Sequence, residues 1–281
     1  VTNPSWIPHG DSFSDITCND FLGAQYFVAT DMEGNVKLLQ AEEGYKQSLE
    51  MAKKWMDNGW YDPDAVLNQN DTKDKMVAGT GLSYFVTAEY GVEVAQGGSL
   101  GFEVVCPKTF DGMIRTNNVN SWGAGVTVTS DGPERAVRVL EQFYTNGELM
   151  TTLNWGVEGV DYELDDEGLV KRYSSDVYFE HDAFFGNNLL MTPLSGTSPD
   201  FYEMAQKINN ESEKSPYLGF AVDTTGMDNL IAGLNAVYEQ YHYTLTSGYY
   251  TEELYQEYLA KLEGAGMNDY IAAAQQQLDA W

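Results

Sequence analysis

The chain has 281 residues, which is enough for one large domain or two small ones with a sizeable buried core. Acidic residues outnumber basic ones by 43 to 15, and the net charge of −28 makes the surface repel nucleic acid and anionic lipid headgroups. A content of 43% hydrophobic and 13% aromatic residues excludes a disordered chain. The sequence holds no run of the roughly 20 apolar residues that a membrane helix needs.

The first elements expected are a hairpin and an amphipathic helix. Residues 19–40 predict a β-hairpin around a turn at Asp31–Asn35. A helix follows from about Glu42 and ends before Gly59. Its apolar positions recur at helical spacing on one face: Tyr45, Leu49, Ala52 and Trp55.

Short elements fill the middle of the chain. The pattern predicts small helices over 71–79 and 88–96, and strands over 82–87, 100–107 and 123–129. A longer helix is expected from Pro133, with Ser130 and Asp131 as capping candidates. Its inward face would carry Ala136, Val137, Leu140, Phe143 and Tyr144.

The second half predicts mainly helices. Residues 154–174 read as a loop and hairpin, and helices follow over about 198–208 and 227–246, from Thr251, and from Asn268 to the end. Strands and helices mix without strict alternation. This mixture favours an α/β fold class, with helices around a mixed sheet.

No motif gives a convincing catalytic or metal site. Gly97-Gly98-Ser99-Leu100-Gly101 matches G-x-S-x-G, but a helix-like stretch precedes it and a strand-like run follows, so a glycine-rich turn is expected instead. Asp161, Glu163 and Asp165 have the alternate spacing of a calcium loop, but Asp166 stands where that loop needs glycine. A hairpin turn is the favoured interpretation, and calcium is the alternative.

The two cysteines, Cys18 and Cys106, lack metal-ligand or redox spacing. Cys106 lies in the apolar run VVCP, which indicates a buried free thiol. A Cys18–Cys106 disulfide is the alternative.

Aromatic residues in polar segments favour ligand binding. Sugars present apolar C–H faces and hydroxyl rims, which suit an aromatic ring flanked by amides or carboxylates. Trp122 has Asn118 and Asn120 before it in an irregular segment, where the alternative role is packing at a hinge. Trp155 lies close to Glu158 in a glycine-containing loop, and both are candidates for ligand contact.

The last third of the chain carries a longer pattern. Its features are GF-x-x-D at Gly219–Asp223, Leu245 with Gly248, Ala265-Gly266 before Tyr270-Ile271, and the ending Gln275 to Ala280. This pattern resembles the closing region of bacterial ABC-transporter solute-binding proteins of carbohydrate-type family 1. The branch is that of the LipO-like lipoproteins, whose C-terminal domain has no assigned function.

Earlier segments strengthen this resemblance. GWYDPD at residues 59–64, followed by Met76–Gly79, is similar to a run in those proteins, and so is the strand-to-helix block from Gly123. NWGVEGVDY at 154–162 is similar to their yGiEGkhY motif, with Val160-Asp161 in place of the usual pair. Tyr84 falls where such proteins place a stacking aromatic residue.

The resemblance implies a periplasmic-binding-protein-like (type II) lobe. About two hundred residues that precede these motifs in the family are not in this chain, so we expect a C-terminal part of a two-lobed fold, with Val1 not a natural start. Residues 1–121 would form a segment of the C-terminal lobe. Residues 122–193 would cross toward the N-terminal lobe, and residues 194–281 would complete the C-terminal lobe.

The function implied is binding rather than catalysis, with no cofactor. The intact protein would be an extracellular, lipid-anchored monomer that binds a sugar or another small-molecule ligand and delivers it to ABC permease subunits in the membrane. It would have no nucleic-acid partner, and the anchor and signal peptide would lie outside this chain. Two alternatives stay open: a glycoside hydrolase or esterase, and a surface interaction module without a small ligand.

Overall fold

A computed structural model describes residues 20–23, 27–31, 33–60, 72–84, 90–107, 113–116, 123–174 and 186–281. The chain divides into two compact units, which we treat separately. The first unit comprises Val1–Thr87, Phe110–Asn118 and Glu213–Trp281. The second comprises Ala88–Thr109 and Val119–Ser212.

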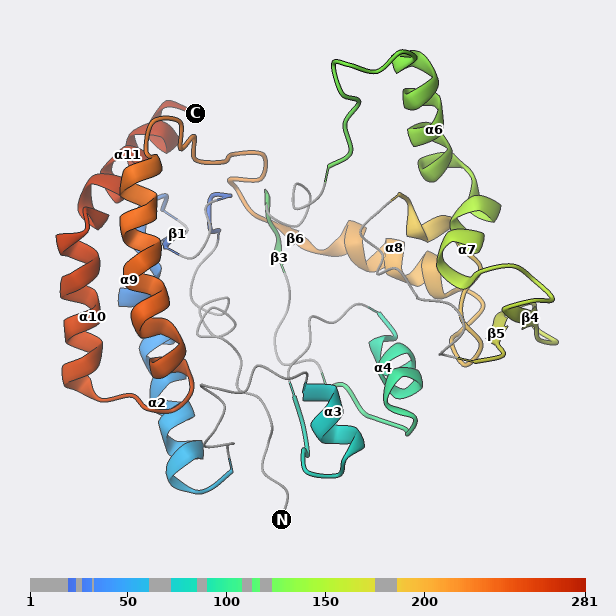
Figure 1. Ribbon diagram of the computed structural model, residues 1–281, viewed down its shortest axis with the longest axis horizontal. Coiled ribbons are helices and arrows are strands. Elements are labelled where there is room, and N and C mark those ends of the chain that lie inside the picture. The colour runs from blue at the N-terminus through green and yellow to red at the C-terminus, as the bar shows by residue number, and fades with distance from the viewer. Residues whose placement is uncertain are drawn as a thin grey trace. The chain divides into compact units, whose positions relative to one another are not determined.

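The first unit combines the beginning and the end of the chain (Figure 1). Its early elements are β1 (Val28–Thr30), β2 (Val36–Leu38), the 3-10 turn η1 (Leu39–Ala41), α2 (Glu43–Asp57), α3 (Thr72–Val77) and β3 (Met113–Ile114). Its late elements are β6 (Glu213–Lys214), α9 (Asp228–Thr246), α10 (Glu252–Gly264) and α11 (Met267–Ala280). Strands β1 and β2 pair antiparallel, whereas β3 and β6 form a short parallel pair.

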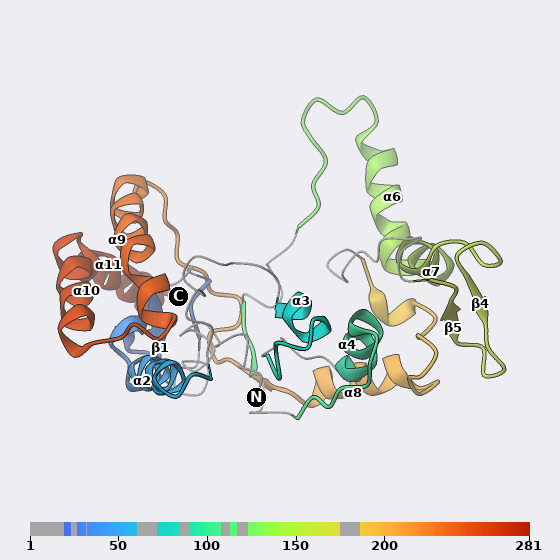
Figure 2. The same ribbon diagram turned by 60° about the horizontal axis from the view of Figure 1, so that its bottom comes forward.

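The core of the first unit lies between α2, α9, α10, α11 and the β1–β2 hairpin, which stay grouped in both views (Figures 1 and 2). Each helix turns one apolar face inward because its apolar residues recur three or four positions apart. The side chains that are completely buried there include Tyr45, Leu49, Leu234, Leu245, Tyr258 and Leu262.

Glutamine side chains fix α11 to two loops. The Gln275 amide accepts a hydrogen bond from the Val36 N–H at 2.8 Å and donates one to the Gly34 carbonyl at 3.0 Å. Gln277 repeats this pattern with the N–H and carbonyl of Asp223, at 2.7 and 3.0 Å. Each glutamine amide therefore satisfies one backbone N–H and one backbone carbonyl of the segment that it contacts.

The second unit is built from short elements. They are α4 (Val92–Leu100), α6 (Pro133–Thr145), α7 (Gly147–Trp155), β4 (Tyr162–Leu164), β5 (Val170–Arg172), the 3-10 turn η2 (Asn188–Leu190) and α8 (Phe201–Glu211). Strands β4 and β5 form an antiparallel hairpin beside α7 (Figure 2). Trp155, Tyr162, Val170 and Leu194 pack together under it.

The mixed α/β class is confirmed, since the described residues combine helices with three two-stranded sheets. The hairpin expected within residues 19–40 and the helix after Glu42 are both present, with Tyr45 and Leu49 buried as predicted. Thr251 caps α10 by accepting a hydrogen bond from the Leu254 N–H at 3.1 Å.

Several predicted strands are wrong. Leu100 is the last residue of α4, Gly101 ends that helix with φ of +78°, and the segment up to Pro107 has no regular structure. Gly97 and Gly98 of the G-x-S-x-G match consequently lie in the last turn of α4, and Gly101 caps that helix. Residues 123–129 are also irregular, and Leu82–Tyr84 form no strand. These runs have apolar residues, but no described strand pairs with them.

The inward face expected on α6 is not buried. The helix forms as predicted from Pro133, yet Val137 is 56% exposed and Tyr144 is 55% exposed. Helix formation follows the local pattern, whereas burial needs a second element over the face. Cys106 is a free thiol that is half-buried rather than fully buried, and burial raises the pKa of its thiol. Cys18 lies outside the described residues.

Candidate functional site

A pocket of about 440 Å³ opens in the second unit beside the N-terminal half of α7. It contains Glu158, one of the residues expected to bind ligand. Its walls come from α7, the turn after it, β4, η2 and the segment after η2: Gly147, Glu148, Thr151, Glu158, Tyr162, Leu164, Leu190 and Thr192.

Helix α7 brings two of the polar residues to the pocket. Asn146 starts the helix, since its side-chain oxygen accepts a hydrogen bond from the Leu149 N–H at 3.1 Å. Glu148 and Thr151 are three positions apart, which places them on the same face of the helix. The carboxylate and the hydroxyl thus reach the pocket from neighbouring turns.

A tight turn after α7 positions Glu158. Gly156 ends the helix with φ of +88°, and a Cβ at this position would lie 2.4 Å from Oδ2 of Asp161. The same carboxylate accepts a hydrogen bond from the Val157 N–H at 2.8 Å. The Gly159 N–H then donates to the Tyr162 carbonyl at 2.7 Å, which holds Glu158 next to the start of β4.

Trp155 supports the pocket from behind. Its side chain is only 6% exposed, and its indole N–H donates to the Thr192 carbonyl at 3.0 Å. Thr192 in turn donates its N–H to the Thr151 hydroxyl at 2.9 Å. The indole therefore fixes the Thr192 segment against α7, and direct contact between Trp155 and a ligand stays a prediction.

The pocket is acidic and rich in hydrogen-bonding groups. Burial raises the pKa of Tyr162, and the nearby carboxylates of Glu158 and Glu148 raise it further. The phenol therefore keeps its proton and can donate a hydrogen bond. Among the described residues that line the pocket, none is lysine or arginine. Carboxylates accept hydrogen bonds from ligand hydroxyls, threonines donate and accept, and leucines suit C–H surfaces. The arrangement fits a polyhydroxylated ligand better than an anionic one.

The three carboxylates of the suspected calcium loop stabilise the β4–β5 hairpin and the turn that precedes it. Asp165 accepts hydrogen bonds from the Ser195 hydroxyl at 2.7 Å and from the N–H groups of Glu167 and Leu169, both at 2.9 Å. The Ser195 contact is the main cause of the lowered pKa of Asp165. Glu163 pairs with Lys171 at 3.0 Å, and Asp161 holds the Gly156 turn. No group of three or more His, Cys, Asp or Glu residues in the described segments could hold a metal ion.

The other predicted site residues lie elsewhere. Tyr84 belongs to the first unit, where it is half-buried in an irregular stretch. Asn118, Asn120 and Trp122 lie outside the described residues. Ligand contact by these four residues stays a prediction.

Sequence reasoning missed most of the pocket. Tyr162 follows Glu158 in the same motif, and its alternation with Glu163 in β4 could have indicated that it points inward. Thr192 is 41 residues from Thr151, and no local pattern connects them.

Comparison with known proteins gives a fold match. The family described as Domain of unknown function (DUF3502) matches residues 216–281, the region whose motifs carry the resemblance. No curated protein matches this chain. The N-glycan transport solute binding protein (NgtS) from Streptococcus pneumoniae, crystallised with Man1GlcNAc, is 18% identical with a TM-score of 0.76. That match covers 99% of this chain and 64% of NgtS.

Two more solved structures match the fold of this chain. A second NgtS structure gives a TM-score of 0.72 at 18% identity, over 93% of this chain and 60% of the other. The S. pneumoniae ABC-transporter substrate binding protein FusA, in complex with kestose, gives 0.50 at 16% identity, over 91% and 57% of the two chains. The chain thus has the fold of solute-binding proteins and spans less than two thirds of their length. No helix in the described segments has both the length and the apolar character to span a bilayer.

Proposed function

We propose that this chain is part of an extracellular solute-binding component of an ABC importer that binds a sugar or oligosaccharide. The observation that carries the proposal is the fold match over 99% of the chain to an N-glycan transport solute binding protein. Solute-binding folds hold their ligands in concave sites with a few oriented polar groups. The α7–β4 pocket, formed by Glu148, Thr151, Glu158, Tyr162 and Thr192, is the sugar-contacting surface of the second unit.

The chemistry of this pocket supports a carbohydrate ligand. A hydroxyl of the sugar would donate to the Glu158 carboxylate, which is a charge-assisted hydrogen bond. The protonated Tyr162 phenol would donate to another sugar oxygen. Leu164 and Leu190, which are 43% and 39% exposed, would contact the C–H faces of the ring.

The mechanism we propose is closure of two lobes around the ligand. Residues 1–121 and 194–281 would contribute to the C-terminal lobe, and residues 122–193 would cross to the N-terminal lobe. The structure has two compact units with separate cores, whose bounds differ from this proposed division because residues 88–109 and 194–212 belong to the second unit. Tyr84, Asn118, Asn120, Trp122 and Trp155 remain candidates for further ligand contacts.

The proposed role is binding without catalysis and without a cofactor. It is supported by the similar structures, which are named as solute-binding or substrate-binding proteins. In this proposal the intact protein is a monomer that is anchored to the cell surface by lipid. Its macromolecular partners are ABC permease subunits.

The decisive experiment is calorimetric titration of the chain with Man1GlcNAc, kestose and an anionic uronate oligosaccharide. We expect a neutral sugar to bind and the uronate to bind at least about tenfold more weakly, because carboxylates repel one another. Glu158→Gln and Tyr162→Phe should each weaken binding of the neutral sugar about tenfold, as expected for the loss of a hydrogen bond involving a charged or buried group.

Glu163→Gln is the matched control, since Glu163 lies on β4 but outside the pocket and pairs with Lys171. This variant should retain wild-type affinity. Unchanged affinity in the Glu158 and Tyr162 variants would remove the pocket from the binding site. Release of product from aryl-glycosides or esters by the chain would contradict the binding-only role.

A further inference from the structure

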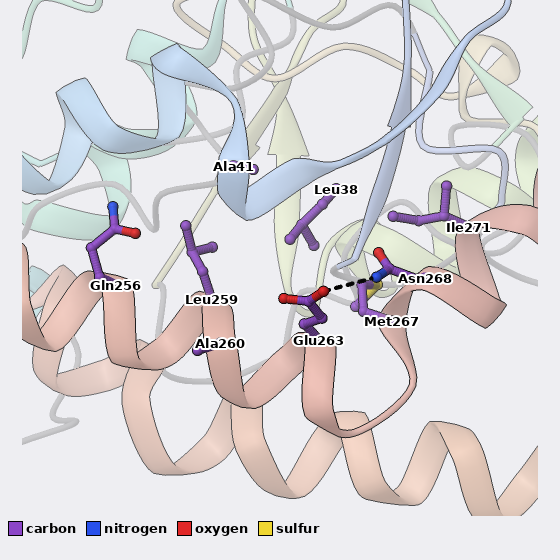
Figure 3. Close-up of a pocket in the computed structure, with 9 residues that line it drawn as sticks. All are labelled: Leu38, Ala41, Gln256, Leu259, Ala260, Glu263, Met267, Asn268 and Ile271. Carbon is purple, nitrogen blue, oxygen red and sulfur yellow. Dashed lines mark hydrogen bonds between the residues drawn. The ribbon is translucent and has the colours of Figure 1, made fainter.

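A second open groove lies on the first unit, far in sequence from the sugar pocket. It has a volume of about 360 Å³ and runs between α10, the start of α11 and the end of β2 (Figure 3). Met267, which is 1% exposed, lies at its base. Leu259 and Ile271 are only partly buried, so they keep apolar surface toward the groove while they pack on the core.

The shape of the groove is fixed by the surrounding structure. Gln275, one turn after Ile271, holds α11 to the outer edge of β2 through the Val36 N–H. At the junction of α10 and α11, the Asn268 amide donates to the Glu263 carboxylate at 3.3 Å (Figure 3). The groove is therefore already formed, and a ligand would not have to order it.

The edge of β2 offers a backbone contact in this groove. The Leu39 N–H donates to the Phe27 carbonyl, and the Val36 N–H points the other way, toward Gln275. Backbone N–H groups alternate in direction along a strand that pairs on one side. The N–H of Leu38 therefore points to the same edge as that of Val36. Ile271, the α11 residue beside it in the groove, has an aliphatic side chain with no acceptor to offer.

The two helices that border the groove are mainly acidic. Residues 251–281, which form α10 and α11, contain six acidic residues and one basic residue, Lys261. Glu263 lies on the groove itself, and Lys261 is not among the residues that line it. An approaching cationic segment would be attracted by this surface, and an acidic segment would be repelled.

We infer that this groove docks an extended, basic segment of a partner protein, anchored by one aliphatic side chain. The anchor side chain lies between Leu259 and Ile271, above Met267. A carbonyl of the segment accepts the Leu38 N–H, a single backbone contact beside the Val36 N–H that Gln275 already occupies. A lysine or arginine two positions along the segment has the same side-chain direction as the anchor and reaches Glu263.

The test uses a short, acetylated and amidated peptide of alternating lysine and leucine, with binding followed by fluorescence polarisation on the 281-residue chain. Two control peptides replace leucine by serine or lysine by glutamate. The lysine–leucine peptide should bind, and each control should bind at least about tenfold more weakly, because one lacks the anchor and the other has the wrong charge.

Two matched variants separate groove binding from general attraction to an acidic protein. Ala260→Arg places a long cation in the groove, whereas Ala272→Arg makes the same charge change at an exposed position on α11 that does not line it. Ala260→Arg should weaken binding about tenfold or more, and Ala272→Arg less than about twofold. Hydrogen exchange at the Leu38 amide should slow in the complex.

Failure of the lysine–leucine peptide to bind overturns the inference. Equal weakening by the two arginine variants also overturns it, since the peptide would then respond only to net charge. Binding that leaves exchange at Leu38 unchanged would overturn the backbone contact to β2. None of these outcomes depends on sugar binding by the second unit.

Discussion

Replacing Leu234 with alanine should destabilise the first unit by about 2–5 kcal/mol. Leu234 lies on α9 and is 0% exposed, within the cluster that also includes Tyr45 of α2 and Tyr258 of α10. Removal of its outer three carbons loses roughly 2.4 kcal/mol of transfer free energy, at about 0.8 kcal/mol for each. The cavity that remains adds to this, since helices that pack from several sides cannot all move in to fill it.

The measurement is urea unfolding with hydrogen exchange of individual segments as the readout, which gives a midpoint for each segment. A single midpoint would not suffice, because the chain has two compact units that need not unfold together. The midpoint should fall for segments of α9, α10 and α2, and it should stay unchanged for α7 in the second unit. Leu82→Ala serves as the control, since this residue is 67% exposed and the substitution should change stability by less than about 0.5 kcal/mol.

Leu259→Ala provides a graded comparison. Leu259 is only partly buried and faces the groove, so its truncation removes less buried surface than that of Leu234. Its cost should therefore be clearly smaller. An unchanged midpoint in Leu234→Ala, or an equal loss in α7 segments, would refute the view that Leu234 lies in a core confined to the first unit.

Three further predictions concern single positions. Gly248→Ala should lower stability by about 1–3 kcal/mol in a thermal melt, because φ is +87° and a Cβ would lie 2.9 Å from the Ala52 carbonyl oxygen. Gly264→Ala is the control and should be neutral or stabilising, because the space around Gly264 is open. Burial raises the pKa of Tyr255 from 10.0 to about 12. The unfolded chain therefore releases this proton at a lower pH than the folded one, so the stability that Tyr255 contributes is complete below pH 10 and is lost as the pH rises toward 12. The fall in the free energy of unfolding over this pH range, measured by urea titration, should be smaller in Tyr255→Phe. Trp122→Ala should weaken sugar binding about thirtyfold in calorimetry if the indole stacks on the ligand, and wild-type affinity would assign it to the hinge instead.

The helices of the first unit could be predicted because their signals are local. Tyr45 and Leu49 in α2, and Leu234 and Tyr241 in α9, follow helical spacing over long segments with polar residues between them. Thr251 also gave a clear start signal for α10 through its hydroxyl. These features need no information from distant parts of the chain.

The predicted strands failed because short apolar runs do not specify their own partners. Residues 100–107 contain a valine pair typical of strands, but Val105 is 88% exposed and no described strand pairs with it. The two glycines before Ser99 predict a turn, whereas the helix α4 continues through them to Leu100. Glycine lowers helix propensity without excluding a helix.

The pocket could be predicted only in part for a related reason. Glu158 stands in a motif whose glycines indicate a tight turn, so the sequence marked it as a candidate. Its counterparts Thr151 and Thr192 come together through a hydrogen bond across 41 residues, with Trp155 holding the second of them in place. An indole that was expected to meet the ligand thus has a supporting contact that the sequence did not indicate.

The segment that matches the DUF3502 family, residues 216–281, depends on the start of the chain for its core. Its three helices turn apolar faces toward Tyr45 and Leu49 of α2 and toward Val36 of β2, all far earlier in the sequence. Tyr255 also donates its hydroxyl to the Gln40 carbonyl at 2.8 Å. Without residues 20–57 these apolar faces would meet water, so the matched segment is one part of a folding unit. The α10–α11 groove follows the same logic, because Leu38 supplies its second wall; any partner of that groove recognises the joined unit and not the matched segment alone.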